Sequence, residues 1–345
     1  MKNSLILLFS LCLLLSACAP ASTRPATLTV MTHDSFAISE EIVRSFEEAN
    51  HAKVSFLQSG DAGSVLNQAI LTKDAPLADV LFGVDNTFLS RALDADIFEA
   101  HRSPALNDVP SEFVIDKTYR ALPVDYGDVC INYDKKYFAD NHLSIPHSFE
   151  DLAKPEYKDL LVVENPATSS PGLAFMLATR AYFGDGFLEY WQSLKENGVV
   201  VVDGWETAYY TNFSASSGRG PQPMVVSYAS SPAAEVFFAA EPLTESPTGS
   251  IVASGMCFRQ IEFVGVLKNG KNRELAEKFV DFILGKPFQE DMPLNMFVYP
   301  VNKTAQLPDV FVQHAQVADQ PALLPFDEIA ANRDPWIEAW TEVMK

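Results

Sequence analysis

Residues 28–57 read LTVMTHDSFAISEEIVRSFEEANHAKVSFL, and this stretch decides the fold class. The apolar run at 28–31 predicts a β-strand, and apolar side chains at helical spacing over 42–49 predict a helix that Ser39 caps. A second strand is expected at 54–57. Strand, helix and strand in this order indicate a mostly parallel sheet that helices cover on both faces.

The same alternation continues to the end of the chain. In the first half we expect a helix at 64–73, a buried strand at 78–84 and a helix at 86–93. A second set follows, with strands at 129–133, 160–163, 199–202, 225–228 and 261–267 and helices at 172–183, 186–197 and 273–284. Two such sets predict two α/β lobes.

Length and charge narrow the function classes. The 345 residues are enough for two domains with a sizeable core. Acidic residues outnumber basic ones by 45 to 25, which gives a formal charge of −20. Such a surface repels phosphate backbones and anionic headgroups, so it disfavours binding to nucleic acid or to a membrane surface. A neutral or cationic small ligand suits it better.

The N-terminus carries an export signal. Lys2 precedes an apolar run at 5–15 that is too short to span a bilayer, and residues 15–18 read LSAC. This pattern resembles a bacterial lipobox, so we expect a signal peptide at 1–17, a lipid on Cys18 and a tether at 18–27. An ordinary signal peptide is the alternative. Either way the protein is expected to act outside the cytoplasmic membrane.

Two cysteines remain in the predicted mature chain, Cys130 and Cys257. In an oxidising compartment they either form a disulfide or stay as two buried thiols, and the sequence leaves both open. No Cys-x-x-Cys motif and no zinc-like histidine spacing occurs. We therefore expect no metal site and no cofactor.

An exported, acidic, two-lobed chain suggests a solute-binding protein, and three stretches resemble type II periplasmic binding proteins. They are 28–37 (LTVMTHDSFA), 78–86 (ADVLFGVDN) and 275–289 (LAEKFVDFILGKPFQ). The resemblance implies two α/β lobes, each a mostly parallel sheet flanked by helices, with the ligand cleft between them.

The resemblance also implies the division of the chain. Residues 28–123 and 264–345 would form the first lobe, and 124–263 the second. The chain is expected to cross between lobes near 122–125 and 263–266, so that a ligand closes the lobes about these strands.

Five further motifs, in order, resemble the thiamine-binding subunits of thiamine ABC importers. They are 124–127 (VDYG), 168–173 (TSSPGL), 204–209 (GWETAY), 227–233 (SYASSPA) and 299–301 (YPV). The resemblance implies a monomeric receptor rather than an enzyme. It would bind thiamine or its phosphates and deliver them to a membrane permease and its ATPase.

The same resemblance implies a set of ligand-binding residues. The set is Asp61, Ala62, Ser169, Ser170, Trp205, Tyr228, Ala229, Ser230, Ser231 and Phe297. A thiazolium cation favours aromatic faces and a carboxylate, which Trp205, Tyr228 and Asp61 would supply. The alternative is that both residues have structural roles only, Trp205 in the core and Asp61 as a helix N-cap.

The other positions carry weaker signals. The helix that begins after Ser169 offers free amides to a phosphate or hydroxyl tail, although it equally fits a well-capped helix. Phe297 stands where the family often has Trp, and His33 where Tyr is common. Ala62 replaces a frequent Gly.

Two rival functions use the same fold. The adjacent Tyr209 and Tyr210 resemble the tyrosine pair of ferric-ion-binding proteins, because phenolates suit Fe³⁺. A pyrimidine-precursor enzyme is the other rival, but the sequence offers no Cys/His cluster, nucleophile–base pair or glycine-rich phosphate loop for it.

Overall fold

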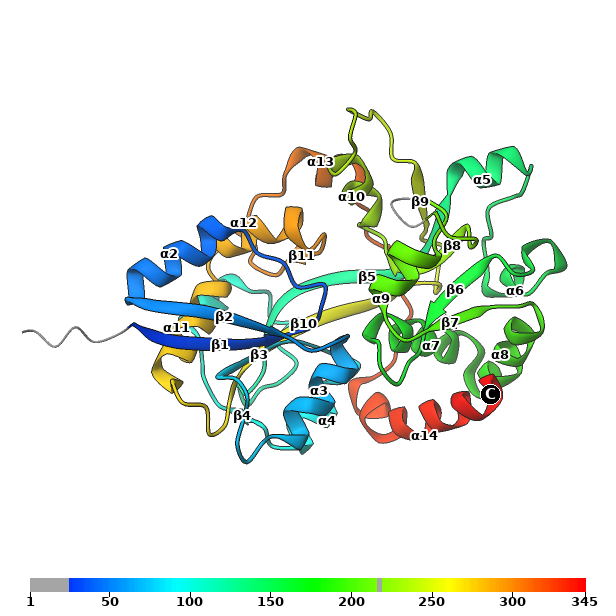
Figure 1. Ribbon diagram of the computed structural model, residues 1–345. Helices are drawn as coiled ribbons and strands as arrows, with labels where there is room; N and C mark the ends of the chain where they lie inside the picture. Colours follow the sequence, from blue (N-terminus) through cyan, green and yellow to red (C-terminus); the bar gives the residue numbers. More distant parts are fainter. Residues whose placement is uncertain (1–24, 216–218) are drawn as a thin grey trace, which may run out of the picture.

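Two lobes lie side by side in the computed structural model, which describes residues 25–215 and 219–345 (Figure 1). The predicted signal peptide and Cys18 lie outside the described residues. One mixed sheet runs through both lobes in the order β2-β1-β3-β10-β5-β8-β6-β7. The long antiparallel strands β5 (Leu122–Asp134) and β10 (Phe258–Leu267) cross from one lobe to the other. The expected α/β fold is confirmed.

The first lobe is built on the strand–helix–strand unit that opens the chain. Strand β1 (Ala26–Thr32) pairs in parallel with β2 (Ala52–Gln58) and with β3 (Val80–Asp85). Ser39 caps the intervening helix α2 (Glu40–Asn50) by accepting a hydrogen bond from the Ile42 amide. The remaining elements of this lobe are α3 (Ala62–Leu71), α4 (Leu89–Asp94), β4 (Phe98–Glu99), α11 (Arg273–Ile283) and α12 (Lys286–Asn295).

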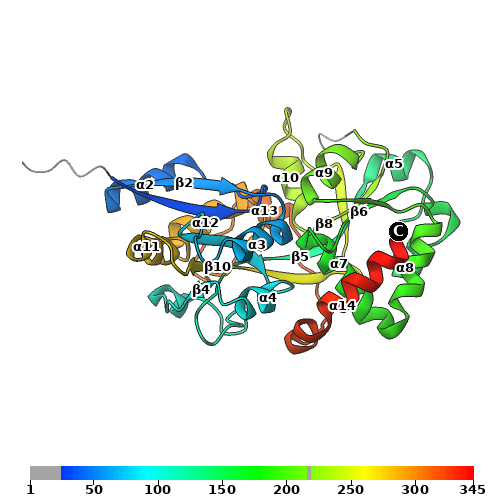
Figure 2. The same ribbon diagram turned by 60° about the horizontal axis from the view of Figure 1, so that its bottom comes forward.

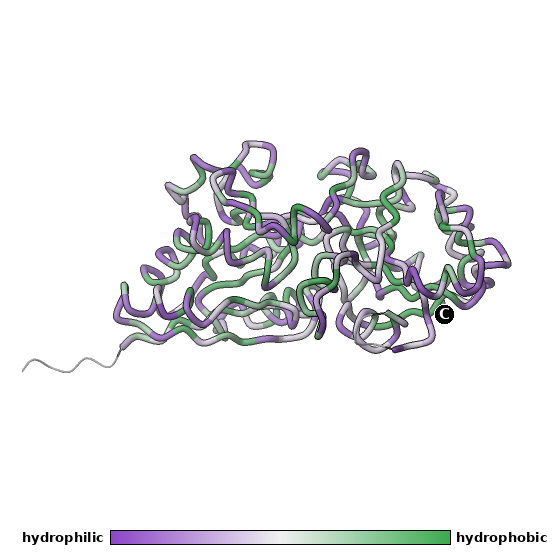
Figure 3. The backbone as a smooth tube through the Cα atoms, turned by 90° about the horizontal axis from the view of Figure 1, so that it is seen from above, coloured by the Kyte–Doolittle hydropathy of each residue, from purple (hydrophilic) through white to green (hydrophobic). Residues whose placement is uncertain are grey.

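The second lobe continues the sheet with β8 (Met224–Tyr228), β6 (Leu161–Glu164) and β7 (Val200–Val202). Strand β6 is parallel to both of its neighbours, whereas β8 is antiparallel to β5. Figure 3 shows the apolar stretches within both lobes and the polar ones along their outer turns. The other elements here are α5 (Lys135–Asp140), α6 (Phe149–Leu152), α7 (Ser170–Phe183), α8 (Phe187–Glu196), α9 (Trp205–Thr207), α10 (Ser231–Phe237) and β9 (Thr248–Ile251).

The end of the chain returns to the second lobe. After β11 (Tyr299–Pro300) and α13 (Asp309–His314), the last helix α14 (Phe326–Met344) packs against α8 (Figure 2). Trp340 meets Trp191 edge-on, with ring centroids 5.3 Å apart. The sequence predicted 264–345 in the first lobe and left the packing of its C-terminal part open; α14 packs against α8 of the second lobe, where Trp340 covers apolar surface.

The two crossing strands change register between the lobes. Asp125 pairs with Glu262, but Phe263 pairs with Pro123, so β5 has one extra residue here. The pairing of β10 with β3 also shifts, between Phe263 and Val264. Bulges bend a strand and interrupt its hydrogen bonds. Both irregularities fall within the segments where the sequence predicts the crossing.

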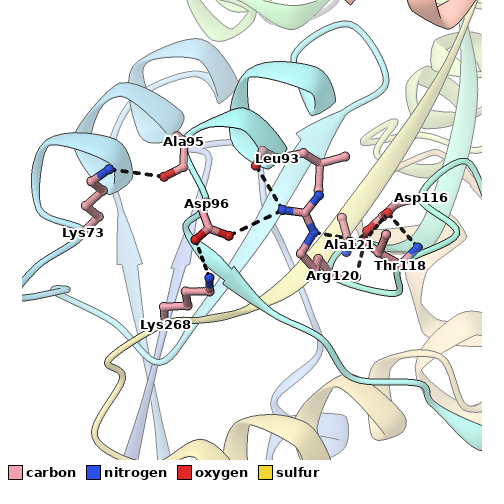
Figure 4. A network of polar contacts seen from close by, with 9 residues as sticks. All are labelled: Lys73, Leu93, Ala95, Asp96, Asp116, Thr118, Arg120, Ala121 and Lys268. Atoms are coloured by element: carbon pink, nitrogen blue, oxygen red, sulfur yellow. Dashed lines mark hydrogen bonds and ion pairs between the residues drawn. The ribbon is translucent and has the colours of Figure 1, made fainter.

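Both ends of the crossing pair are fixed. In the first lobe Asp96 lies 3.5 Å from the Arg120 guanidinium, just before β5, and 2.6 Å from the Lys268 ammonium, just after β10 (Figure 4). In the second lobe a disulfide joins Cys130 to Cys257, whose Cα atoms are 4.4 Å apart. The cysteine pairing that the sequence left open is therefore a cross-strand bond. It ties β5 to the residue before β10.

Candidate binding site

A cavity of about 970 Å³ lies between the lobes. This volume is in the range of small-molecule sites. The first lobe contributes His33, Asp34 and Asp61, and the second contributes an aromatic group around Trp205. Glu262, on the crossing strand β10, also lines the cavity.

Trp205 is held in place by three contacts. Its ring stacks on Tyr209, with centroids 5.0 Å apart and planes 20° apart. Its indole Nε1 donates to the Ser227 hydroxyl at 2.9 Å, and its backbone N–H donates to Asp61 Oδ2 at 3.0 Å. Because these contacts fix the ring, Trp205 can offer a preformed aromatic surface to a ligand.

Asp61 lies at the other side of the cavity, where it caps α3. Its Oδ1 accepts from the Ala62 N–H at 2.6 Å, and its Oδ2 accepts from the Trp205 N–H of the second lobe. The N-cap role that the sequence offered as an alternative is therefore real. It does not remove Asp61 from the cavity, which the residue also lines.

Tyr228 ends β8 beside the crossing strands. Its hydroxyl donates to Gln260 Oε1 at 2.6 Å, and the Gln260 amide in turn donates to buried Asp85. Burial, followed by the charge of Glu262, raises the pKa of Tyr228, so the phenol stays neutral. A side chain at Gly127 would approach the Tyr228 ring to 2.8 Å, so the glycine makes room for this ring.

A buried carboxyl pair includes Glu262 of the cavity lining. Asp125 and Glu262 are direct cross-strand partners, and both are buried. Burial and the neighbouring Glu262 raise the pKa of Asp125, so one proton is retained by the pair. His33 Nε2 lies 3.4 Å from Glu262 Oε1. Burial lowers the pKa of His33, but attraction to Glu262 outweighs that effect and the pKa is raised overall.

The charged side chains of the lining are mostly acidic. The basic members are His33 and Lys136, whereas the acidic members are Asp34, Asp61, Asp134, Glu206, Glu235 and Glu262. A low-dielectric cavity of this composition attracts a cation.

The N-terminus of α7 meets the same cavity. Ser170 and Pro171 line it, and Ser169 is fully buried behind them. The Ser169 hydroxyl has no hydrogen-bond partner among the described residues. Burial, with a smaller contribution from Asp61, raises the pKa of the nearby Glu164 carboxyl. This end of the helix therefore presents its free amides beside a neutralised acid.

The structure brings six of the predicted residues to the cavity lining and leaves four behind it. The lining members are Asp61, Ser170, Trp205, Tyr228, Ser231 and Phe297. Ala62 and Ser169 are buried in their helix ends, Ala229 packs beside the disulfide, and Ser230 donates its hydroxyl to the Phe297 carbonyl.

Several lining residues were absent from the predicted set. Glu206 lies within the GWETAY motif, which was a usable signal. Glu235 accepts the Tyr209 hydroxyl at 2.6 Å, and Phe238 stands at the rim with 68% of its surface exposed. No local sequence motif identified Glu262 as a cavity residue, because its position depends on the pairing of strands that are distant in the chain.

The tyrosine pair considered for iron belongs to the aromatic group around Trp205. The rings of Tyr209 and Tyr210 pack edge-on, with their centroids 5.6 Å apart. Across residues 25–215 and 219–345, no three or more His, Cys, Asp or Glu side chains gather as metal ligands would. Within those same ranges, no helix has the length and apolar character needed to cross a membrane.

A family profile and two relatives of known name match most of this chain. The profile of the bacterial extracellular solute-binding proteins matches residues 75–317. A thiamine-binding periplasmic protein of Salmonella typhimurium is 31% identical over 95% of this chain and 96% of its own length. The corresponding protein of Escherichia coli is 30% identical, with the same coverage of both chains.

Solved structures agree on the fold. A periplasmic thiamin binding protein superposes with a TM-score of 0.81 at 26% identity, covering 94% of this chain and 98% of its own. A ferric binding protein from Campylobacter jejuni reaches 0.71 at 19% identity, covering 92% and 99%, and shares the fold alone. These matches confirm the resemblance drawn from the motifs. The chain belongs to the family of bacterial extracellular solute-binding proteins.

Proposed function

We propose that this protein is the substrate-binding component of an ABC importer and that it binds thiamine or a thiamine phosphate. One observation carries the proposal: a single cavity holds the fixed Trp205–Tyr209 stack and an acidic lining that includes Asp61. Relatives named as thiamine-binding, about 30% identical over nearly their whole length, support the same ligand.

The chemistry of thiamine fits this lining. Its aminopyrimidine is flat, and its thiazolium carries a permanent positive charge. The aromatic rings offer stacking and cation–π contacts, and Asp61 and Glu262 offer negative charge. A cation–π contact contributes about 0.5–2 kcal/mol, depending on how far water is excluded.

The hydroxyethyl or phosphate tail would lie at the start of α7. Ser170 lines the cavity there, and a helix N-terminus with free amides binds anionic oxygens.

The pair Tyr209 and Tyr210 favours thiamine over iron. Burial, followed by the charge of Glu235, raises the pKa of Tyr209 well above its ordinary value, and burial also raises that of Tyr210. Iron binding requires phenolates, which this environment opposes. The stacked Tyr209 instead supports Trp205.

The transport role places the protein outside the cytoplasmic membrane. Lobe closure about the bulges at Asp125 and Phe263 would trap the ligand. The closed protein, a monomer without enzymatic activity, would deliver it to the permease and its ATPase. Lipidation of Cys18 would keep the protein at the membrane, since acyl chains contribute about 0.8 kcal/mol per buried CH₂.

Mass spectrometry of the ligand that co-purifies with the full chain tests this function. We expect thiamine or one of its phosphates, with quenching of tryptophan fluorescence on titration. Recovery of another solute, with no response to any thiamine form, would overturn the proposal. A visible phenolate band on adding ferric ion would favour the iron alternative.

A further inference from the structure

We propose that the N-terminus of α3 is a latch that joins the two lobes, and that Asp61 and Gly63 are the positioning residues of this latch. Two hydrogen bonds cross from α3 to the second lobe. The Gly63 N–H donates to the Thr168 carbonyl at 3.1 Å, and Asp61 accepts the Trp205 N–H at 3.0 Å. One residue separates the two positions, so a single helix end contacts two loops of the opposite lobe.

The first-lobe side of the latch is rigid. The turn before α3 is tied to the loop after β1, because Gly60 N–H donates to Asp34 Oδ1 at 2.9 Å and Asp34 N–H donates to the Gly60 carbonyl at 3.0 Å. Gly60 itself has a φ of 87°, which favours glycine. Asp61 then caps the helix. The donors and acceptors of α3 are therefore held in place by contacts within the first lobe alone.

The second-lobe side is rigid as well. Thr168, in the loop between β6 and α7, donates its hydroxyl to the Asp203 carbonyl at 2.7 Å. This bond ties its loop to the one that carries Trp205. The two partners of the latch thus form one unit, and Trp205 is further fixed by Ser227.

Position 63 leaves space for hydrogen only. A methyl group there would lie 2.8 Å from the Thr168 carbonyl oxygen and 3.0 Å from the tip of the Phe88 ring. The first contact is with backbone of the opposite lobe, which cannot rotate away, whereas the second is with a side chain of the same lobe. Alanine at 63 would therefore hold the lobes apart.

The latch links ligand capture to closure. Asp61 holds the Trp205 backbone and faces the cavity in which Trp205 would stack on the ligand. A cation in the cavity and a closed latch therefore involve the same carboxylate. This coupling to thiamine rests on the proposed function, but the latch itself does not.

The variant Gly63→Ala tests the latch by interlobe distance. Spin labels on Lys53→Cys and Glu196→Cys, both exposed and on different lobes, report that distance by double electron–electron resonance. We expect a longer and broader distance for Gly63→Ala, with or without thiamine. We also expect the ligand to dissociate at least about tenfold faster, because the two hydrogen bonds between the lobes are lost. The association rate should change little.

Two control variants distinguish an effect on the latch from a general effect on folding. Gly186→Ala is a matched glycine change, since a methyl there meets only the Glu189 carboxylate at 3.8 Å. Phe88→Leu relieves the contact within the first lobe, so Gly63→Ala with Phe88→Leu keeps only the contact between lobes. Wild-type distances and dissociation rates in both Gly63 variants would overturn the latch. Absence of thiamine binding by the wild type would overturn the proposed function instead, and the distances without ligand would still test the latch.

Discussion

The two walls of the cavity differ in what they offer a ligand. The first-lobe wall carries charge, in His33, Asp34 and Asp61, whereas the second-lobe wall carries the stacked rings of Trp205 and Tyr209 together with Glu206 and Glu235. A flat cation needs both a countercharge and an aromatic face; the second-lobe wall offers both, and the first-lobe wall adds the charge of Asp61. The difference teaches that closing the lobes adds negative charge opposite a wall that already carries the aromatic rings.

Removal of the aromatic wall should have the largest effect. Trp205→Ala deletes stacking and cation–π contacts, together about 1–3 kcal/mol, so affinity for thiamine should fall roughly tenfold to a hundredfold. Titration calorimetry measures the loss. Trp336→Ala, on α14 and outside the cavity lining, is the matched control. Equal affinities in the wild type and Trp205→Ala would remove the aromatic wall from the account.

Neutralising the charged wall should have the next largest effect. Asp61→Asn keeps the shape but deletes the countercharge, so thiamine affinity should fall about tenfold. The same substitution should reduce the affinity for an analogue with an uncharged ring in place of the thiazolium by a smaller factor. Equal losses for the two ligands would show that Asp61 contributes through geometry alone.

The start of α7 should produce a smaller and selective effect. Ser170→Ala removes a hydroxyl from the cavity lining, so binding of thiamine phosphate should weaken about fivefold. The affinity for unphosphorylated thiamine should fall by a smaller factor. Ser169→Ala is the comparison, because that residue is buried behind the lining. If both phosphorylated and free thiamine respond alike, the tail does not lie at this helix.

The smallest expected effect is a pH dependence of the charged wall. The raised pKa of His33 means that its imidazole becomes protonated as pH falls toward and below that pKa, where it neutralises Glu262. A cationic ligand should therefore bind about threefold more weakly at pH 6 than at pH 8. His33→Gln should flatten this profile. A wild-type affinity that is constant or higher at pH 6 would contradict it.

Local patterns in the sequence were enough for the fold and for part of the site. Strand and helix periodicity located β1, α2 and β2, and the motif order located the segments that carry Trp205 and Tyr228. Each of these features depends on neighbours in the chain. That is why periodicity and short motifs could predict them.

Features that depend on distant pairing could not be predicted in this way. The Asp125–Glu262 pair requires the register of β5 against β10, and so does the cysteine pairing. The contact of Asp61 with the Trp205 backbone requires both lobes at once. The placement of α14 on the second lobe depends on where an apolar face finds a partner.

One titration tests the central claim most directly: calorimetry of the full wild-type chain with thiamine and with its isostere that has an uncharged ring. The account predicts that thiamine binds at least about tenfold more tightly, because the aromatic wall favours a cation and the acidic wall supplies its countercharge. Equal affinities for the two ligands, or no binding of thiamine, would contradict it.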